Sequence, residues 1–242
     1  MALVSCARSE APHKSSLSAV APAPTFVNGG RCGPSSDSRV PADAGCVTSI
    51  AAGDQRLYVY AQTGSDDLPK SWRIRLVTGQ RVLVDRPLHA GNVTSYPRVI
   101  AATDVDQDGD ADWWVKVRDY TSHGAPWAGM NLFVGIDDSI APLRYQGSPL
   151  VIDFGGISRR GNGAACLDGD LVLLQADAQN RLNTKWAISQ VRFSISRARA
   201  KLVRRTRGTL VIHGYNDPDL DPYYEVRCYG TNFSVFAPRP SP

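Results

Sequence analysis

Short apolar runs separated by clusters of turn-forming residues dominate this chain from about residue 47 onward. Within a run, β-branched and aromatic residues alternate with polar ones, which is the period-two spacing of a strand with one buried face. Gly, Pro, Asn and Asp gather between the runs, and this favours antiparallel strands joined by short connections. The pattern predicts an all-β fold of antiparallel sheets with few helices. Predicted strands include residues 56–60, 72–77, 81–84, 112–117, 132–134, 171–174, 190–195 and 209–212.

A weak internal repeat groups these strands into larger units. The units start near Thr48, Thr103 and Cys166, each with a loop rich in Ala, Asp and Gly. A period of roughly 55–60 residues suits a four-stranded propeller blade or a related stacked sheet. We therefore expect propeller-blade-like repeats, about three to four blades or a partial propeller.

The first 45 residues differ from the rest in composition. They are rich in Ser, Ala and Pro and show no alternation, so they predict a disordered tether in front of a β-repeat domain at 46–237 and a tail at 238–242. Within the tether, residues 3–6 (Leu-Val-Ser-Cys) resemble a bacterial lipobox, in which Cys6 would be lipidated. We hypothesise that a signal peptide is encoded upstream of Met1, and a chance match in a disordered tail is the alternative.

The five cysteines indicate in which cellular compartment the protein is expected. Cys6 stands alone near the N-terminus, and the other four could form two disulfides in three possible pairings. We favour Cys32–Cys46 and Cys166–Cys228, which would fit a secreted or cell-surface protein. Four buried free thiols in a cytosolic protein are the alternative.

Charge and hydropathy exclude some partners. The formal net charge is +4 and the isoelectric point about 8.9, which is too mildly basic by itself to imply a nucleic-acid partner. No apolar stretch reaches the roughly 18–20 residues of a transmembrane helix, so membrane attachment is expected only through a lipid anchor. The most basic stretch, residues 192–207, could face an anionic glycan, lipid or nucleic acid, but we prefer a solvated face that resists aggregation. We expect a monomer.

The strongest chemical signal is the acidic loop at residues 104–112, Asp-Val-Asp-Gln-Asp-Gly-Asp-Ala-Asp. Carboxylates at alternate positions can point inward from a curling loop, and Ca²⁺ takes six to eight oxygen ligands. Gly109 permits the sharp turn that the loop needs. An EF-hand requires a Glu at position twelve and flanking helices, whereas Val115 stands there, within a predicted strand. The sequence therefore predicts a calcium loop between two strands, with a merely acidic turn as the alternative.

Residues 99–115, which contain this loop and the strand-like residues on both sides, resemble an FG-GAP/VCBS-type repeat, the calcium-loop unit of integrin-α-like propellers. The patterned region, about 47–236, is similar to small actinobacterial secreted or lipid-anchored proteins built from such repeats, and residues 161–168 resemble the start of their second repeat. The chain is too short for a seven-bladed propeller. Loops 51–55 and 166–171 look like shortened acidic loops that lack enough carboxylates, so the resemblance implies one structural Ca²⁺ ion. By motif its ligands are the carboxylates of four aspartates and a backbone carbonyl near the fourth acidic position: Asp104, Asp106, Asp108, Asp112 and, through the backbone, Asp110.

No catalytic constellation is recognisable in the sequence, because the four histidines are scattered: His13, His89, His123 and His213. We therefore expect a non-catalytic extracytoplasmic protein, a binding or structural module of the cell envelope, whose partner could be an envelope protein or a glycan. A secreted hydrolase with a dispersed active site is the alternative. The acidic segment 216–222 could bind a second cation, although a Pro-pinned turn is the preferred interpretation. Of the adjacent Trp113 and Trp114, we expect one in the core, and the other could serve as a platform for a partner or glycan, although packing against the protein is the default expectation.

Overall fold

The computed structural model describes residues 37–63, 69–88, 97–122, 125–156, 159–213, 217–229 and 231–234. The prediction of an all-β fold of antiparallel sheets with few helices is confirmed: across these ranges the sole helix is a short 3-10 helix, η1 (Pro218–Tyr223). None of the described helical residues forms an apolar helix long enough to cross a membrane. Cys6 and Cys32 lie outside the described ranges, as does most of the predicted tether, and the side chain of Cys46 is also not described.

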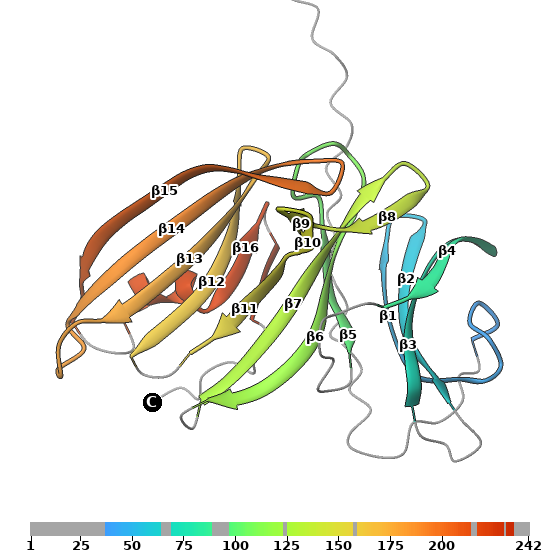
Figure 1. Ribbon diagram of the computed structural model, residues 1–242, viewed down its shortest axis with the longest axis horizontal. Coiled ribbons are helices and arrows are strands. Elements are labelled where there is room, and N and C mark those ends of the chain that lie inside the picture. The colour runs from blue at the N-terminus through green and yellow to red at the C-terminus, as the bar shows by residue number, and fades with distance from the viewer. Residues whose placement is uncertain are drawn as a thin grey trace, which may run out of the picture.

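The first four strands form a separate antiparallel sheet in sequence order (Figure 1). Tight turns join β1 to β2 and β3 to β4, where a glycine adopts a left-handed conformation, with φ of 59° at Gly53 and 56° at Gly79. The strands of this small sheet are β1 (Ala44–Ala52), β2 (Gln55–Thr63), β3 (Pro69–Thr78) and β4 (Arg81–Pro87).

The remaining thirteen strands form one large sheet with the order β10-β9-β15-β14-β13-β12-β11-β7-β6-β5. Strand β8 pairs with β7, while β16 pairs with β12 and β17 with β16. Among the described strands, only the β12–β16 and β9–β15 pairs are parallel. The strands are β5 (Arg98–Thr103), β6 (Asp112–Ser122), β7 (Ala125–Ile136), β8 (Ser139–Pro142), β9 (Arg144–Tyr145), β10 (Ser148–Pro149), β11 (Val151–Gly155), β12 (Arg160–Leu167), β13 (Asp170–Ala178), β14 (Lys185–Ser196), β15 (Arg199–Val211), β16 (Glu225–Cys228) and β17 (Thr231–Ser234).

The large sheet curls strongly, as Figure 1 shows. The curl is held by Leu143, which lies between β8 and β9 and is fully buried. Its backbone N–H donates to the carbonyl of Leu132 on β7 at 2.7 Å, and the next residue, Arg144, donates to the carbonyl of Ala198 beside β15 at 2.9 Å. Two distant parts of the sheet are therefore linked through one short segment.

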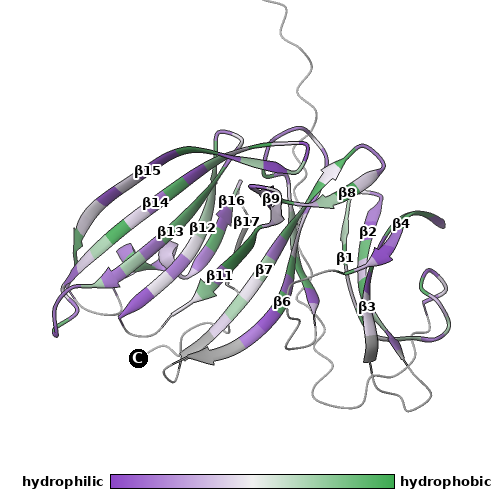
Figure 2. Cartoon of the chain, viewed as in Figure 1, coloured by the Kyte–Doolittle hydropathy of each residue, from purple (hydrophilic) through white to green (hydrophobic). Residues whose placement is uncertain are grey.

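Apolar side chains fill the inside of the curl and the space between the two sheets. Figure 2 shows hydrophilic and hydrophobic residues interleaved along many strands, as expected for strands that bury one face. Trp114 lies inside the curl, with its ring centroid 6.1 Å from that of Phe154 in an edge-to-face arrangement. Trp113 lies on the opposite face of β6 and packs with Leu57 and Leu76 of the small sheet. Both tryptophans are fully buried, so the suggestion that one forms an exposed platform is wrong.

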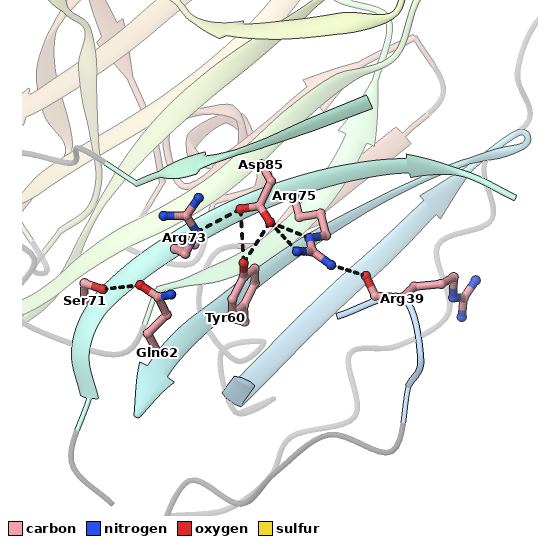
Figure 3. Close-up of polar contacts among 7 residues, drawn as sticks. All are labelled: Arg39, Tyr60, Gln62, Ser71, Arg73, Arg75 and Asp85. Atoms are coloured by element: carbon pink, nitrogen blue, oxygen red, sulfur yellow. Dashed lines mark hydrogen bonds and ion pairs between the residues drawn. The ribbon is translucent and has the colours of Figure 1, made fainter. Parts of the chain in front are cut away.

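The outer face of the small sheet carries a polar cluster centred on Asp85 (Figure 3). The Asp85 carboxylate accepts hydrogen bonds from Tyr60 Oη at 3.1 Å, Arg73 Nε at 2.8 Å and Arg75 Nε at 2.7 Å. Arg75 Nη1 also donates to the carbonyl of Arg39 at 2.8 Å. The cluster thus joins three strands to the segment that precedes β1.

The predicted repeat corresponds only in part to the observed sheets. The unit expected to start near Thr48 falls on the four-stranded sheet, but the units expected near Thr103 and Cys166 share the large sheet. Among the described residues, no closed propeller is present.

Candidate metal centre

The acidic loop connects β5 to β6 at one end of the large sheet. Gln107 and Gly109 adopt left-handed conformations, with φ of 60° and 94°, and so reverse the chain within the loop. The N–H of Gly109 donates to Asp104 Oδ2 at 3.1 Å, and the N–H of Asp110 donates to Asp108 Oδ1 at 2.9 Å. Local hydrogen bonds and a glycine turn therefore give the loop its curled shape, as the sequence predicts.

Three carboxylates meet inside this curl. Asp104, Asp106 and Asp108 each offer one oxygen, and these three oxygens all lie within 4.8 Å of one another. Oδ1 of Asp104 and Oδ1 of Asp106 are buried and have no hydrogen-bond partner among the described residues. Because an unpartnered buried carboxylate oxygen is costly, the arrangement fits a hard cation, which prefers oxygen ligands of this kind.

The pKa values of the loop carboxylates also favour a bound cation. Burial raises the pKa of Asp106 to about 6, and the neighbouring negative charges of Asp108 and Asp104 add to the effect. Burial also raises the pKa of Asp104, against an opposing hydrogen bond from the N–H of Gly109. A cation between these carboxylates would offset the repulsion that adds to the effect of burial on both pKa values.

Asp112 has a different place from the other predicted ligands. It is fully buried, and its two oxygens accept backbone hydrogen bonds from Val105 at 2.7 Å and from Gly135 at 2.9 Å. Burial raises the pKa of Asp112 well above its usual value, and the charge of Asp106 adds to that shift. Asp112 therefore lies close to the carboxylate group while also fastening the loop to β7, and each of its oxygens retains a second lone pair for a cation.

Asp110 points away from the three clustered carboxylates. Its Oδ2 accepts a hydrogen bond from the N–H of Asp137, in the turn between β7 and β8, at 2.9 Å. The role expected for Asp110 involves its backbone carbonyl, so this side-chain contact leaves that prediction open. The structure thus brings together three of the five predicted ligand residues and attaches the other two to β7 and the turn after it.

Two further turns lie against the acidic loop. A cavity of about 170 Å³ separates the β1–β2 turn from the loop, with Gly53 and Asp54 on one side and Gly109 and Asp110 on the other. The β12–β13 turn approaches more closely, since a Cβ built on Gly169 would lie 3.1 Å from the carbonyl oxygen of Asp106. These are the two segments that the sequence marks as shortened acidic loops, and their proximity in space has no local sequence signal.

The negative charge of the β12–β13 turn is already partly balanced within the chain. Arg192 on β14 forms ion pairs with both Asp168, at 3.6 Å, and Asp170. Tyr229 Oη accepts a hydrogen bond from the N–H of Gly169 at 2.6 Å. Arg192 and Tyr229 are far from the turn in sequence, and we did not predict either contact. Their arrangement favours one cation site over two.

The other predicted sites are placed as follows. Cys166 on β12 and Cys228 on β16 form a disulfide with a Cα–Cα distance of 4.6 Å, so this pairing is confirmed. The Cys32–Cys46 pairing and lipidation of Cys6 fall outside what the structure describes and stay predictions.

The acidic segment after residue 216 forms the 3-10 helix η1, and Asp217 caps it by accepting from the N–H of Asp219 at 3.0 Å. Among the described residues, the group of Asp104, Asp106 and Asp108 is the sole cluster of three side chains arranged to hold a metal ion.

A larger cavity, of about 210 Å³, lies against strands β11 to β14. Asp153, Asn162, Gln175 and Ser189 contribute to its lining, and no histidine does. His213 is the one histidine in the described ranges, and its backbone N–H donates to Asp217. The cavity therefore does not join a histidine to a carboxylate or serine.

No protein-family model matches the chain, and no characterised protein or solved structure is detectably similar to it. Any functional assignment therefore depends on the chemistry of the site.

Proposed function

We propose that this chain is an extracytoplasmic, non-catalytic β protein whose 104–112 loop binds one structural Ca²⁺ ion. The observation that carries the proposal is the pair of buried, unpartnered oxygens of Asp104 and Asp106, which lie together with a third carboxylate oxygen from Asp108. Three carboxylates and further oxygens from water or backbone give the hard, flexible shell that Ca²⁺ prefers. Mg²⁺ demands a stricter octahedral geometry and fits a curled loop of this kind less well.

The ion would stabilise the junction between several strands. The loop is fastened to β7 through Asp112 and lies against the turns that contain Gly53 and Gly169. Neutralising its carboxylates would therefore stabilise contacts between the small sheet, the start of the large sheet and β12–β13. In this proposal the loop is an FG-GAP/VCBS-type calcium loop, used here at the meeting point of two sheets rather than in a described propeller blade.

The proposed location is the cell envelope or the extracellular space. The Cys166–Cys228 disulfide is compatible with an oxidising compartment outside the cytoplasm. A structural ion without a catalytic constellation favours a binding or structural module, whose partner could be an envelope protein or a glycan.

Calorimetric titration of the metal-free chain with Ca²⁺ and with Mg²⁺ tests the metal site. We expect one Ca²⁺ per chain with an affinity well above that for Mg²⁺, and loss of the Ca²⁺ signal in Asp106→Asn. Asp54→Asn is the matched control, since Asp54 is an exposed carboxylate beside the loop but outside the three-carboxylate group. Absence of Ca²⁺ binding in the unmutated chain, or equal loss of binding in both variants, would contradict the proposal.

A further inference from the structure

Strand β15 leaves most of one edge open. Along its whole length it pairs with β14, whereas on its other side only Arg199 and Ala200 pair with β9. The register with β14 shifts between Arg192 and Phe193, so Val203 is an extra residue on β15. Beyond it, residues 204–211 run regularly along β14, and no described strand pairs with their other edge. Alternate residues there direct their backbone N–H and C=O groups away from β14.

The open edge is strongly cationic. No Asp or Glu occurs from residue 192 to residue 213, which contains seven Arg and Lys residues. Arg204, Arg205 and Arg207 are exposed, and within the described residues their guanidinium groups form no ion pair or hydrogen bond. Because neighbouring residues of a strand point to opposite faces, Arg204 lies on one face of the sheet and Arg205 and Arg207 lie on the other. Positive charge therefore borders the edge on both sides.

The same strand exposes apolar side chains. Val203 is 54% exposed, and Val211, at the end of the strand, is 73% exposed. Charged residues on an edge strand commonly act only to prevent pairing with other chains. Val211 lies on the open edge and Val203 directly before it, so both would add apolar contact area for a bound segment.

The positive charge of β15 also indicates which kind of strand could pair with the open edge. A second copy of this chain pairing through the same edge would bring arginines against arginines, and like charges opposite each other destabilise a strand pair. An acidic strand would instead place carboxylates opposite the arginines, at the Cβ separations of about 4.5–5.5 Å typical of cross-strand pairs. Backbone hydrogen bonds would supply affinity, and the charges would supply specificity.

We propose that residues 204–211 of β15 form a docking edge for an extended acidic peptide segment of a partner protein, which adds a strand to the large sheet. Eight residues are enough for a typical strand of five or six residues to pair along this edge. This proposal goes beyond the calcium site and is independent of it, since β15 contributes no residue to the acidic loop.

Fluorescence anisotropy with short peptides and the full chain tests the docking edge. The probe is a labelled peptide of about ten residues with alternating Glu and Val, and we expect it to bind at least about tenfold more tightly than its Gln-Val counterpart. A third peptide, Glu-Val with alternate backbone nitrogens methylated, keeps the charge but cannot complete the strand ladder. We expect it to bind at least about tenfold more weakly than the unmethylated probe.

Charge reversal on the strand provides the second arm of the test. We expect the double variant Arg205→Glu/Arg207→Glu to weaken binding of the Glu-Val probe at least about tenfold. Arg181→Glu is the matched control, because Arg181 is an exposed arginine in the β13–β14 connection and should leave affinity unchanged. Retention of the circular-dichroism spectrum and melting temperature shows that the double variant is folded. Thr209→Pro gives an independent test of backbone pairing. The ladder that ends with the Ile212 N–H donating to the carbonyl of Thr184 turns the N–H of Thr209 toward the open edge, so this variant should weaken binding of the Glu-Val probe at least about tenfold.

Three results would overturn the proposal. The first is equal binding of the Glu-Val and Gln-Val probes. The second is equal binding of the methylated probe, together with competition by a sulfated polysaccharide, which would mean that the strand attracts anionic polymers without pairing. The third is unchanged affinity after the Arg205→Glu/Arg207→Glu substitution in a folded protein.

Discussion

At the scale of single residues, the acidic loop combines features that local sequence can predict with features that it cannot. The clustering of Asp104, Asp106 and Asp108 follows from their alternate spacing and from the turn at Gly109, all within one short segment. The fixation of Asp112 by the N–H of Gly135 depends on β7, which is distant in sequence. Spacing therefore predicts the composition of the site but not the contacts that hold it.

Asp106 gives a pH prediction with a defined sign. Its pKa in the folded state is about 6, above the ordinary value of 3.8, so in EDTA the folded chain binds more protons than the unfolded chain between these values. The metal-free protein should thus become less stable as pH rises from about 4 to 7. In saturating Ca²⁺ the trend should reverse, because protons compete with the ion. Thermal melts at several pH values check this, and an identical pH dependence for Asp106→Asn in EDTA would count against it.

Gly169 and Gly147 form a matched pair of variants. Both glycines have a left-handed φ, 75° and 84°, so alanine at either position should cost on the order of 1 kcal/mol from backbone strain. Only at Gly169 would the new Cβ meet the carbonyl of Asp106, at 3.1 Å, while nothing lies within 4 Å at Gly147. We expect Gly169→Ala to weaken Ca²⁺ binding and Gly147→Ala to leave it unchanged. Calorimetric titration distinguishes the two, and equal affinities would show that the β12–β13 turn does not support the loop.

At the scale of elements, the polar cluster on the small sheet shows how one carboxylate stabilises several strands. Burial of Asp85 by itself raises its pKa, but hydrogen bonds from Arg75 and Arg73 outweigh burial and hold the pKa below its ordinary value. Asp85→Ala would leave two largely buried guanidinium groups without their shared partner. We expect a loss of about 2–3 kcal/mol in unfolding free energy.

Chemical denaturation of Asp85→Ala at several pH values checks this expectation. Because the Asp85 pKa is lowered on folding, the stabilisation is present above about pH 4 and is lost as pH falls further. The difference between Asp85→Ala and the unmutated chain should therefore shrink in acid. Arg81→Ala is the control, since its ion pair with Asp138 is highly exposed and should contribute less than about 1 kcal/mol. A loss no larger than that of the control would mean that the cluster is not stabilising.

Strand positions were predictable from alternation, but strand partners were not. Residues 190–195 and 209–212, both predicted as strands, lie within or overlap β14 and β15. The return of β16 to pair in parallel with β12, after η1, has no counterpart in the sequence pattern. Alternation reports which face of a strand is buried, whereas the choice of neighbour depends on distant segments, and for this reason separate blades were expected where one curled sheet is observed.

At the scale of the whole molecule, the acidic loop lies where the two sheets meet. Removing Ca²⁺ should therefore loosen turns that are distant from the loop in sequence. At a free Ca²⁺ concentration 100 times the dissociation constant, the ion should add about 2.7 kcal/mol to the unfolding free energy. Hydrogen exchange should be faster in EDTA around residues 53–55 and 168–170 as well as in the loop. A change confined to residues 104–112 would show that the ion has only a local effect.

The open edge of β15 yields a prediction about assembly. If arginines keep copies of this chain apart, Arg204→Thr/Arg205→Thr/Arg207→Thr should promote self-association through the exposed strand. Analytical ultracentrifugation at several concentrations would detect it, with Arg181→Thr as the control. A triple variant that sediments like the unmutated chain would mean that the strand is protected in another way.

The position of the acidic loop has a consequence for when and where the chain can fold. Its ligand residues are contiguous in sequence, so the ion can bind the loop before the distant turns arrive. Extracellular calcium modules typically have dissociation constants of roughly 0.1–1 mM, whereas calcium sensors of the cytosol have dissociation constants of roughly 0.1–10 μM. If the loop binds Ca²⁺ with a dissociation constant in the extracellular range, it would be empty before export, and the repulsion among its carboxylates would oppose folding. After export Ca²⁺ would fill the loop and remove this repulsion. Calcium would then act as a compartment signal that delays completion of the fold until the chain has left the cell.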